Sequence, residues 1–325
     1  MKNYTIKPYG TKDYNDWNTF ISKAKNATFL FHRDFMEYHQ DRFEDFSLIV
    51  MEGETIVCVL PANRVGDKVY SHQGLTYGGL VYDDKLKQVG VIAVLEALLF
   101  FLKQNEIDKI YFKTIPFIYH HKPAEEINYA LFLANAKLER RDSLAVIDLT
   151  KSYCIAKGRK EGIKKGLLAN LKIIEVDDFD DFWNQILIPN LINKYQAKPV
   201  HSIEEIKKLK RLFPDNIRQF NVYKNENIVA GTTVFVSQNV AHSQYIAADE
   251  TRSKNGSLDY LHDYLLREVF NEKRFFDFGI SNENQGKKLN SGLAFWKESF
   301  GASTLIQDFY EVETANHILL TTVLI

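Results

Sequence analysis

The segment from Ala241 to Gly301 constrains the fold more than any other part of the chain. Its residue pattern predicts a strand, a short polar loop, an amphipathic helix, a second strand, another polar loop and a helix that ends in Phe-Gly. The first loop carries basic and small residues directly before its helix: Arg252, Lys254, Gly256 and Ser257. Unpaired backbone amides and the positive end of the helix dipole attract anions at such a position. The loop therefore predicts a site for a phosphate group.

Composition narrows the class of protein. The 325 residues are 45% hydrophobic and 26% charged, as in globular proteins, and the formal net charge is −1. A chain of this length forms two ordinary domains or one large one. Its balanced charge gives no reason to expect a nucleic acid or an anionic membrane as a partner.

Cysteines, histidines and apolar runs bear on location and metal binding. The two cysteines, Cys58 and Cys154, form no CxxC pair, which indicates free thiols in a reducing compartment. His120 and His121 have no acidic or Cys residue at ligand spacing, so we expect no metal site. The N-terminal sequence MKNYTIKPYG lacks the apolar core of a signal peptide, and the longest apolar run, Val89–Leu102, is too short to span a bilayer. These features predict a cytoplasmic protein without membrane insertion.

The two halves of the chain repeat one order of elements. Each half contains a strand pair, a Gly-containing loop, a long helix and an aromatic strand. The long helices are predicted at residues 86–104 and 257–271, and the aromatic strands that follow them read IDKIYFK and RFFDFGI. Local signals also predict a hairpin turn at Glu52-Gly53-Glu54, a capping box of Ser202 and Glu205 before a helix at 203–212, and a helix at about 287–299. Such a repeat predicts two copies of one mixed α/β unit, with domains at residues 1–150 and 151–325. The alternative is a single irregular α/β domain.

Several segments, taken in order, carry a further indication: TFLFHRDFMEYH, HQGLTYGGL, GRKEGIKKG, DDFWNQILIPNLINKYQAKPVHS, FFDFG and FWKESFG. In this order they resemble the FemAB-like (FemABX) branch of the GNAT acyltransferase superfamily. The resemblance implies two tandem GNAT-like domains, an acceptor side in residues 1–150, a donor side in residues 151–325, and an acceptor cleft between the two. It implies an N-acyltransferase that moves an acyl group from acyl-CoA to an amine. The implied acceptor is a small molecule or a precursor of peptidoglycan or of another envelope polysaccharide, and the implied co-substrate is coenzyme A.

Two departures from the family pattern keep other functions open. GNAT proteins carry Arg or Gln, then Gly three residues later and Gly or Ala five residues later, whereas here Arg252 is followed by Asn255, Gly256 and Ser257. Asn tolerates the left-handed conformation, so the loop can still turn tightly. Members that use aminoacyl-tRNA carry a long charged helical hairpin, which this sequence lacks. An aminoacyl-tRNA-dependent peptide-bridge ligase and a non-catalytic binder of an envelope precursor remain as alternatives.

Acyl transfer to an amine requires a group that accepts a proton and groups that hold the donor and the acceptor. The candidate catalytic residues are His242 and Tyr245 on the strand before the basic loop, and Glu283 after the aromatic strand. Each has an ordinary structural role as its alternative. Residues three apart on a strand face opposite sides, so at most one of His242 and Tyr245 faces a given cleft.

The remaining candidates concern substrates. Arg252, Lys254, Asn255, Gly256 and Ser257 are the predicted cofactor-binding residues, and a solvated loop is their alternative. The predicted acceptor-binding residues are Lys198, His201 and Asn284 in the second half and His32 and Tyr77 in the first half. The first-half aromatics, Phe29, Phe31, Tyr77 and Tyr82, form either a cleft wall or a core. The basic run from Lys157 to Lys165 is either a solvated helix face or a site for a phosphorylated acceptor.

Overall fold

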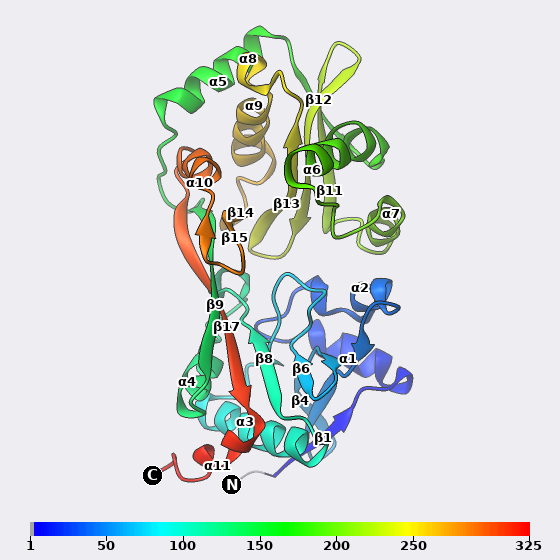
Figure 1. Ribbon diagram of the computed structural model, residues 1–325, viewed down its shortest axis with the longest axis vertical. Coiled ribbons are helices and arrows are strands. Elements are labelled where there is room, and N and C mark those ends of the chain that lie inside the picture. Colours follow the sequence, from blue (N-terminus) through cyan, green and yellow to red (C-terminus); the bar gives the residue numbers. More distant parts are fainter. Residues whose placement is uncertain (1–2) are drawn as a thin grey trace. The chain divides into compact units, whose positions relative to one another are not determined.

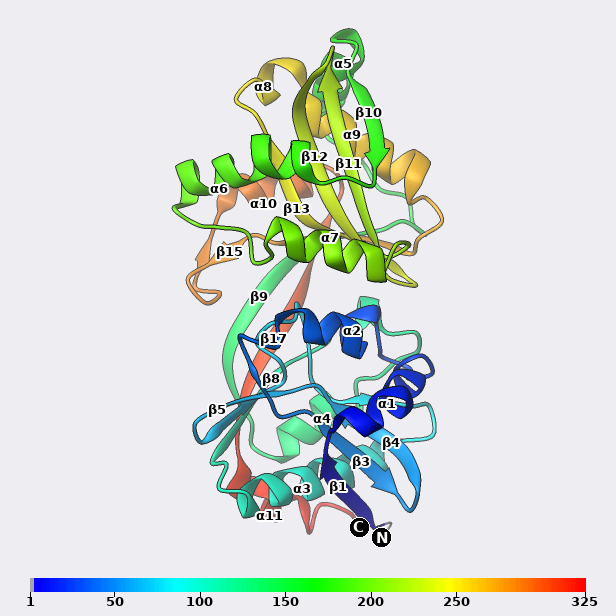
Figure 2. The same ribbon diagram turned by 90° about the vertical axis from the view of Figure 1, so that its right-hand side faces the viewer.

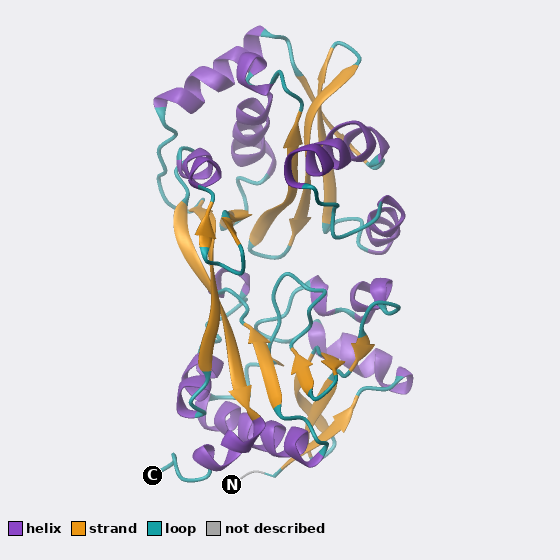
Figure 3. Ribbon diagram, in the orientation of Figure 1, coloured by secondary structure: helices purple, strands orange, loops and turns teal. Residues whose placement is uncertain are grey.

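The computed structural model describes residues 3–325 and divides into two compact units. Unit 1 contains the residues up to Asp142 together with Ile306–Ile325, and unit 2 contains Ser143–Leu305. Both units combine strands with helices (Figure 3), as the predicted mixed α/β class requires. The division differs from the expected single boundary after Thr150, because the chain returns to unit 1 after residue 305. Chain order alone does not reveal such a return, since it depends on pairing between distant segments.

Unit 1 contains both termini. Its helices are α1 (Tyr14–Ile21), α2 (Arg33–Met36), α3 (Gln88–Gln104), α4 (Glu126–Leu133) and α11 (His317–Leu320). Its strands are β1 (Tyr4–Pro8), β2 (Glu44–Asp45), β3 (Leu48–Glu52), β4 (Thr55–Leu60), β5 (Asn63–Val65), β6 (Lys68–Tyr70), β7 (Val81–Tyr82) and β8 (Lys109–Lys113). Strands β1, β3, β4 and β7 form one sheet in the order β1-β3-β4-β7. The predicted hairpin at Gly53 joins β3 to β4, and Gly53 adopts a left-handed φ of 60°.

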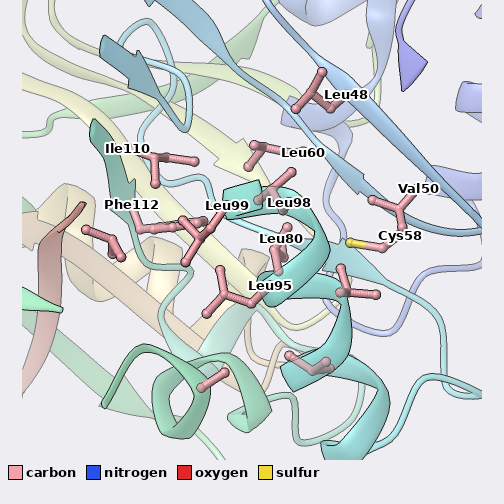
Figure 4. Packing of buried hydrophobic residues seen from close by; sticks show 14 of the residues in the cluster. Leu48, Val50, Cys58, Leu60, Leu80, Leu95, Leu98, Leu99, Ile110 and Phe112 are labelled. Atoms are coloured by element: carbon pink, nitrogen blue, oxygen red, sulfur yellow. The ribbon is translucent and has the colours of Figure 1, made fainter. Parts of the chain in front are cut away.

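The core of unit 1 forms around α3. The sequence of α3 is apolar on nearly every side, and its buried residues include Leu95, Leu98 and Leu99. Figure 4 shows these side chains among residues of β3, β4 and β8. The C-terminal segment contributes Val312 and Leu320 to the same cluster, and Figure 1 shows the red helix α11 beside α3.

Two long strands belong partly to each unit. β9 (Lys137–Asp148) begins in unit 1 and ends in unit 2, whereas β17 (Ser303–Glu313) begins in unit 2 and ends in unit 1. Within unit 1, β17 pairs with β8 in an antiparallel register from Phe309–Lys113 to Glu313–Lys109.

Unit 2 is built on a sheet in which every described pair except β13–β14 is antiparallel, with helices on both faces. Its strands are β10 (Lys172–Val176), β11 (Ile217–Lys224), β12 (Asn227–Val236), β13 (Val240–Ala248), β14 (Phe275–Ile280), β15 (Asn282–Glu283) and β16 (Lys288–Leu289). Its helices are α5 (Lys157–Leu168), α6 (Ile188–Tyr195), α7 (Ile203–Leu212), α8 (Arg252–Asn255), α9 (Ser257–Tyr264) and α10 (Ser291–Glu298), with π-helical segments η5 (Asp181–Leu187) and η6 (Leu265–Val269). Figure 2 shows α6 and α7 across one face of β11–β13 and α9 behind the other.

Local sequence signals account for several of these elements. Helix α7 begins after Ser202, whose hydroxyl accepts a hydrogen bond from the Glu205 amide while the Glu205 carboxylate accepts one from the Ser202 amide. This is the predicted capping box. The predicted helix at 257–271 changes to π-helical geometry after Tyr264. Where a helix was expected from residue 287, the chain first forms the hairpin β15–β16 and begins α10 only at Ser291.

Helix α5 packs closely against the start of α9 through glycine. A Cβ atom added at Gly162 would lie 1.9 Å from Asp259 Oδ2, so this position admits no side chain without movement of α9. At Gly158, one turn earlier, an added Cβ atom would meet nothing within 4 Å. The close approach of the two helices therefore depends on Gly162.

We expect Gly162→Ala to destabilise unit 2 by about 1–3 kcal/mol, because the added methyl group would separate α5 from α9. Gly158→Ala is the matched control, and we expect it to be neutral or stabilising by up to roughly 1 kcal/mol because Ala favours the helix. Thermal unfolding followed by circular dichroism measures both. Equal melting temperatures for the two variants would contradict the close packing.

Candidate active site

The parting of two parallel strands creates the site. β13 and β14 pair only over Val240–His242 and Phe275–Asp277. Beyond this segment β13 continues to Ala248 and β14 to Ile280, and no further pair between them occurs in residues 3–325. The last pair before the strands separate is His242 with Asp277. We refer to this point as the fork.

A cavity of about 800 Å³ lies beyond the fork, within unit 2. This volume lies in the range of small-molecule sites. The wall includes five cationic side chains, Arg159, Lys165, Lys194, Arg252 and Lys297, and two acidic ones, Glu161 and Asp259. Asp259 is paired with Arg159 at 2.7 Å, so the cations remain in excess. The wall also includes apolar side chains: Leu187, Leu191, Ile246, Phe278, Ile280 and Leu293. The cavity therefore suits a ligand that is anionic in one part and apolar in another.

Lys297 on α10 is the buried cation of this cavity. Its side chain is only 3% exposed, and its ammonium group donates to the carbonyl oxygens of Gly279 (3.0 Å) and Ile280 (2.6 Å). A lysine has three N–H donors, and these two carbonyl groups occupy two of them. Burial lowers the pKa of Lys297 to about 8, and the negative charge of Asp277 opposes this lowering.

Asp277 organises the fork. It is fully buried, and one carboxylate oxygen lies 2.9 Å from His242 Nδ1. The other accepts a hydrogen bond of 2.7 Å from the Gly279 amide. Gly279 has a φ of 72°, a conformation that favours glycine, and its carbonyl oxygen receives the Lys297 bond. A continuous path of hydrogen bonds therefore runs from His242 through Asp277 and Gly279 to Lys297.

A bulge in β13 presents two polar side chains to the cavity. The register with β12 shifts between Thr233 and Val234, opposite Ser243 and Tyr245, so that Gln244 is the extra residue. Ser243 and Gln244 both line the cavity. Among the described residues, no partner is found for the buried Ser243 Oγ and Gln244 Oε1 atoms. Bulges re-aim side chains in this way next to functional sites.

The predicted anion loop has a different arrangement from the one expected. Arg252 is exposed and lines the cavity together with Gly256. The Ser257 amide, however, donates to the Asn255 side chain (2.9 Å), and the Gly256 amide donates to the Arg252 carbonyl (2.8 Å). Asn255 and Ser257 are buried beneath α5, which lies beside α8 and α9 (Figure 1). The amides of Gly256 and Ser257 are therefore closed to a phosphate group.

The fifth predicted residue of the anion loop, Lys254, faces away from this cavity. It lines a separate pocket of about 360 Å³ together with Lys224 and Asn227. The loop therefore divides its basic residues between two pockets.

The predicted catalytic residues lie near the cavity but outside its wall. His242 is held by Asp277, as described above. Tyr245 pairs with His201 at 2.7 Å between the hydroxyl and Nδ1, and it packs against Trp183. Burial raises the pKa of Tyr245 to about 12, so the hydroxyl stays protonated at neutral pH. Within the described part of the chain, neither Tyr245 nor His201 belongs to the residues that line the cavity.

The other second-half candidates are exposed. Glu283 lies on the hairpin β15–β16, where its carboxylate accepts a 3.3 Å hydrogen bond from the Asn290 side chain. Asn284 occupies the turn of that hairpin with a φ of 49°. Lys198 is exposed before α7. Glu283, Asn284 and Lys198 are not among the described residues that line the cavity.

The first-half candidates have structural roles. His32 begins α2, where its Nδ1 accepts from the Asp34 amide at 3.4 Å. Tyr77 is 3% exposed, donates its hydroxyl to Thr28 Oγ1 (2.9 Å) and packs against Tyr119. Phe31 and Tyr82 are fully buried. Of the two alternatives for Phe31, Tyr77 and Tyr82, a cleft wall or a core, their burial supports the core.

Metal binding and membrane insertion also depend on features that the structure describes. Within residues 3–325, no group of three or more His, Cys, Asp or Glu side chains is placed to hold a metal ion. None of the described helices is both long and apolar enough to cross a membrane.

Sequence reasoning missed Asp277, Lys297 and the bulge at Gln244. Asp277 and Lys297 lie within FFDFG and FWKESFG, two segments already singled out. The signal was a charged residue inside an aromatic strand or helix, since such a residue is buried only when it is paired.

Comparisons with known proteins give the fold. No family model and no curated protein matches the chain. The crystal structure of FemX matches with a TM-score of 0.67 at 9% identity, covering 98% of this chain and 99% of FemX.

Two further solved structures agree with this match. L-PGS from Bacillus licheniformis matches with a TM-score of 0.54 at 13% identity, covering 82% of this chain and 85% of that one. A tandem GNAT protein from the clavulanic acid biosynthesis pathway matches with a TM-score of 0.53 at 11% identity, covering 96% and 99%. The resemblance drawn from the sequence is thus confirmed at the level of architecture: the chain shares its fold with FemX and with a tandem GNAT protein.

Proposed function

We propose that unit 2 transfers an acyl group from an activated ester or thioester to an amine at the fork. The observation that carries this proposal is the position of Lys297, a buried cation with one donor left over at the wall of a substrate-sized cavity. Attack of an amine on the acyl carbon places negative charge on the carbonyl oxygen. A fixed donor in a site of low dielectric stabilises that charge more than water does.

The bulge supplies a partner for the attacking amine. Gln244 Oε1 is a hydrogen-bond acceptor, and Ser243 Oγ can accept or donate. An amine hydrogen bonded to either oxygen would relieve the cost of a buried unpaired polar atom, about 1–3 kcal/mol. In the reaction the new C–N bond forms, the C–O or C–S bond breaks, and the proton lost by the amine passes to the leaving group.

The identity of the donor separates two candidate functions. The first is the acyl-CoA-dependent N-acyltransferase, supported by Arg252 and the other cationic residues of the cavity wall. The closed amides of Gly256 and Ser257 do not fit the pyrophosphate of coenzyme A at the start of α9. This observation favours the second candidate, a transferase that uses an aminoacyl ester such as aminoacyl-tRNA. For the acceptor we propose an amine on a small molecule or an envelope precursor in the cytoplasm.

We expect the purified chain to transfer label from one donor class to an amine acceptor. Radiolabelled acetyl-CoA and a mixture of charged tRNAs are supplied separately, with amino-sugar nucleotides and peptidoglycan precursors as acceptors. Arg252→Ala should weaken donor binding by about 1–3 kcal/mol because it removes a charge-assisted hydrogen bond. Lys288→Ala, an exposed residue of β16, is the matched control.

Salt dependence identifies the donor further. Binding of a tRNA weakens steeply as salt rises, because phosphate contacts release counterions. Acceptor binding without transfer from either donor would contradict acyl transfer and leave the non-catalytic alternative, in which the chain only binds an envelope precursor.

A further inference from the structure

One buried pair of side chains at the fork, His242 and Asp277, has no role in the proposed acyl transfer. His242 and Asp277 are the last paired residues of β13 and β14, and both side chains are buried. Asp277 is 0% exposed, so its carboxylate is stable only with charge or hydrogen-bond partners on both oxygens. His242 Nδ1 is the partner of one oxygen, and the Gly279 amide is the partner of the other.

We propose that Asp277, held by His242, is the positioning residue that keeps Lys297 charged and directed into the cavity. This inference rests on the proposed function, since it is there that Lys297 acts on the acyl group. Asp277 acts on Lys297 in two ways: through the backbone at Gly279 and through its negative charge. In this proposal it does not contact the substrate.

The positioning operates through Gly279. The bond from the Gly279 amide to Asp277 fixes the turn in which Gly279 has a φ of 72°. In that turn the carbonyl oxygens of Gly279 and Ile280 both accept from the Lys297 ammonium group. A Cβ atom added at Gly279 would lie 3.2 Å from His242 Cε1, so the imidazole ring leaves little room for a side chain at this position.

Charge balance supports the same role. Lys297 is buried, and burial disfavours its charged form. The charge of Lys297 interacts with Asp277 on β14 and with the buried His262 on α9. The acidic residue Asp259 of α9 lines the same cavity, but it is paired with Arg159 at 2.7 Å. The Asp277 carboxylate therefore favours the ammonium form that the oxyanion requires.

The direct test measures the protonation of Lys297 by NMR of ¹⁵N-labelled lysine side chains, with Lys297→Arg to assign the signal. Asp277→Asn keeps an oxygen for the Gly279 amide but removes the charge. We expect its Lys297 signal to titrate about one pH unit or more below that of the wild type. Asp142→Asn is the matched control, because Asp142 is 2% exposed but belongs to unit 1. An unchanged titration in Asp277→Asn, or an equal shift in Asp142→Asn, would overturn the proposal.

A reciprocal measurement covers the case in which Asp277→Asn does not fold. Coupling between two charges acts equally on both, so loss of the Lys297 charge must disfavour the charged form of Asp277. In Lys297→Met we expect the ¹³C-carboxyl signal of Asp277 to titrate at higher pH than in the wild type. A titration that does not move would overturn the proposal.

Activity provides an independent readout. If acyl transfer occurs, the upper limb of its pH profile should shift to lower pH in Asp277→Asn, which a general loss of stability would not produce. If the chain transfers no acyl group, the proposed function fails while both titrations still test the positioning of Lys297.

Discussion

Replacing Lys297 by Met is expected to lower kcat for acyl transfer roughly 100- to 1,000-fold, the usual effect of removing one oxyanion donor. Met has a similar length and no charge, so the cavity keeps its shape while the developing negative charge loses its partner. KM for the donor should change little, because Lys297 acts on the transition state. Steady-state kinetics with the donor class that gives transfer in the labelling assay provide the measurement.

Two controls separate a loss of the oxyanion donor from a general effect of losing a lysine and from unfolding. Lys288→Met changes an exposed lysine of β16 and should leave kcat unchanged. Circular dichroism checks that Lys297→Met is folded, since the Gly279 and Ile280 carbonyls lose their donor. A folded Lys297→Met variant with full kcat would place the chemistry elsewhere.

Acidification from pH 7 to pH 5 is expected to destabilise the chain by several kcal/mol. Burial lowers the pKa of His39, His120 and His262 to about 4 and that of His72 to about 3. These side chains are neutral in the folded state, whereas an unfolded His binds a proton below a pH of about 6.5. The unfolded state therefore binds more protons between about pH 4 and 6.5, and stability falls as pH falls through that window. Each such group contributes about 1.4 kcal/mol per pH unit there.

The loss should be unequal between the units. His39, His72 and His120 belong to unit 1, whereas His262 belongs to unit 2. Thermal unfolding at pH 7, 6 and 5 should therefore show the transition of unit 1 moving farther than that of unit 2. His262→Phe fits the surrounding cluster of Phe278, Trp296 and Phe300 and should reduce the pH dependence of unit 2. Melting temperatures that do not change between pH 7 and 5 would show that these histidines are not held neutral.

Local signals made much of the fold predictable. The capping box at Ser202 and the turn at Gly53 act within a few residues, and each occurs where the sequence predicts it. The order of elements from Ala241 to Gly301 also follows from periodicity. Periodicity did not predict that the residues after 305 belong to unit 1. That assignment depends on the pairing of β17 with β8, which joins segments about 200 residues apart in sequence.

The candidate site was predictable only in part. Arg252 and Gly256, two residues of the predicted anion loop, line the cavity. The backbone amides of Gly256 and Ser257 are closed to a phosphate group because of the Asn255 side chain and the close packing of α5. No local sequence pattern specifies this packing. Lys297 and Asp277 are recognisable as interacting residues only once the bonds from Lys297 to Gly279 and Ile280 join α10 to β14. A site built by long-range contacts is thus harder to predict than the elements that compose it.

Because the chain passes from unit 1 to unit 2 in β9 and returns in β17, the two units are completed at different times during synthesis. Unit 2 is one continuous stretch, Ser143–Leu305, and it is complete when a ribosome has released that stretch. Unit 1 is interrupted, and its cluster still lacks Val312 and Leu320 at that time. The unit that begins first is therefore the later of the two to close, with β8 lacking its neighbour β17 until Ser303–Glu313 has emerged.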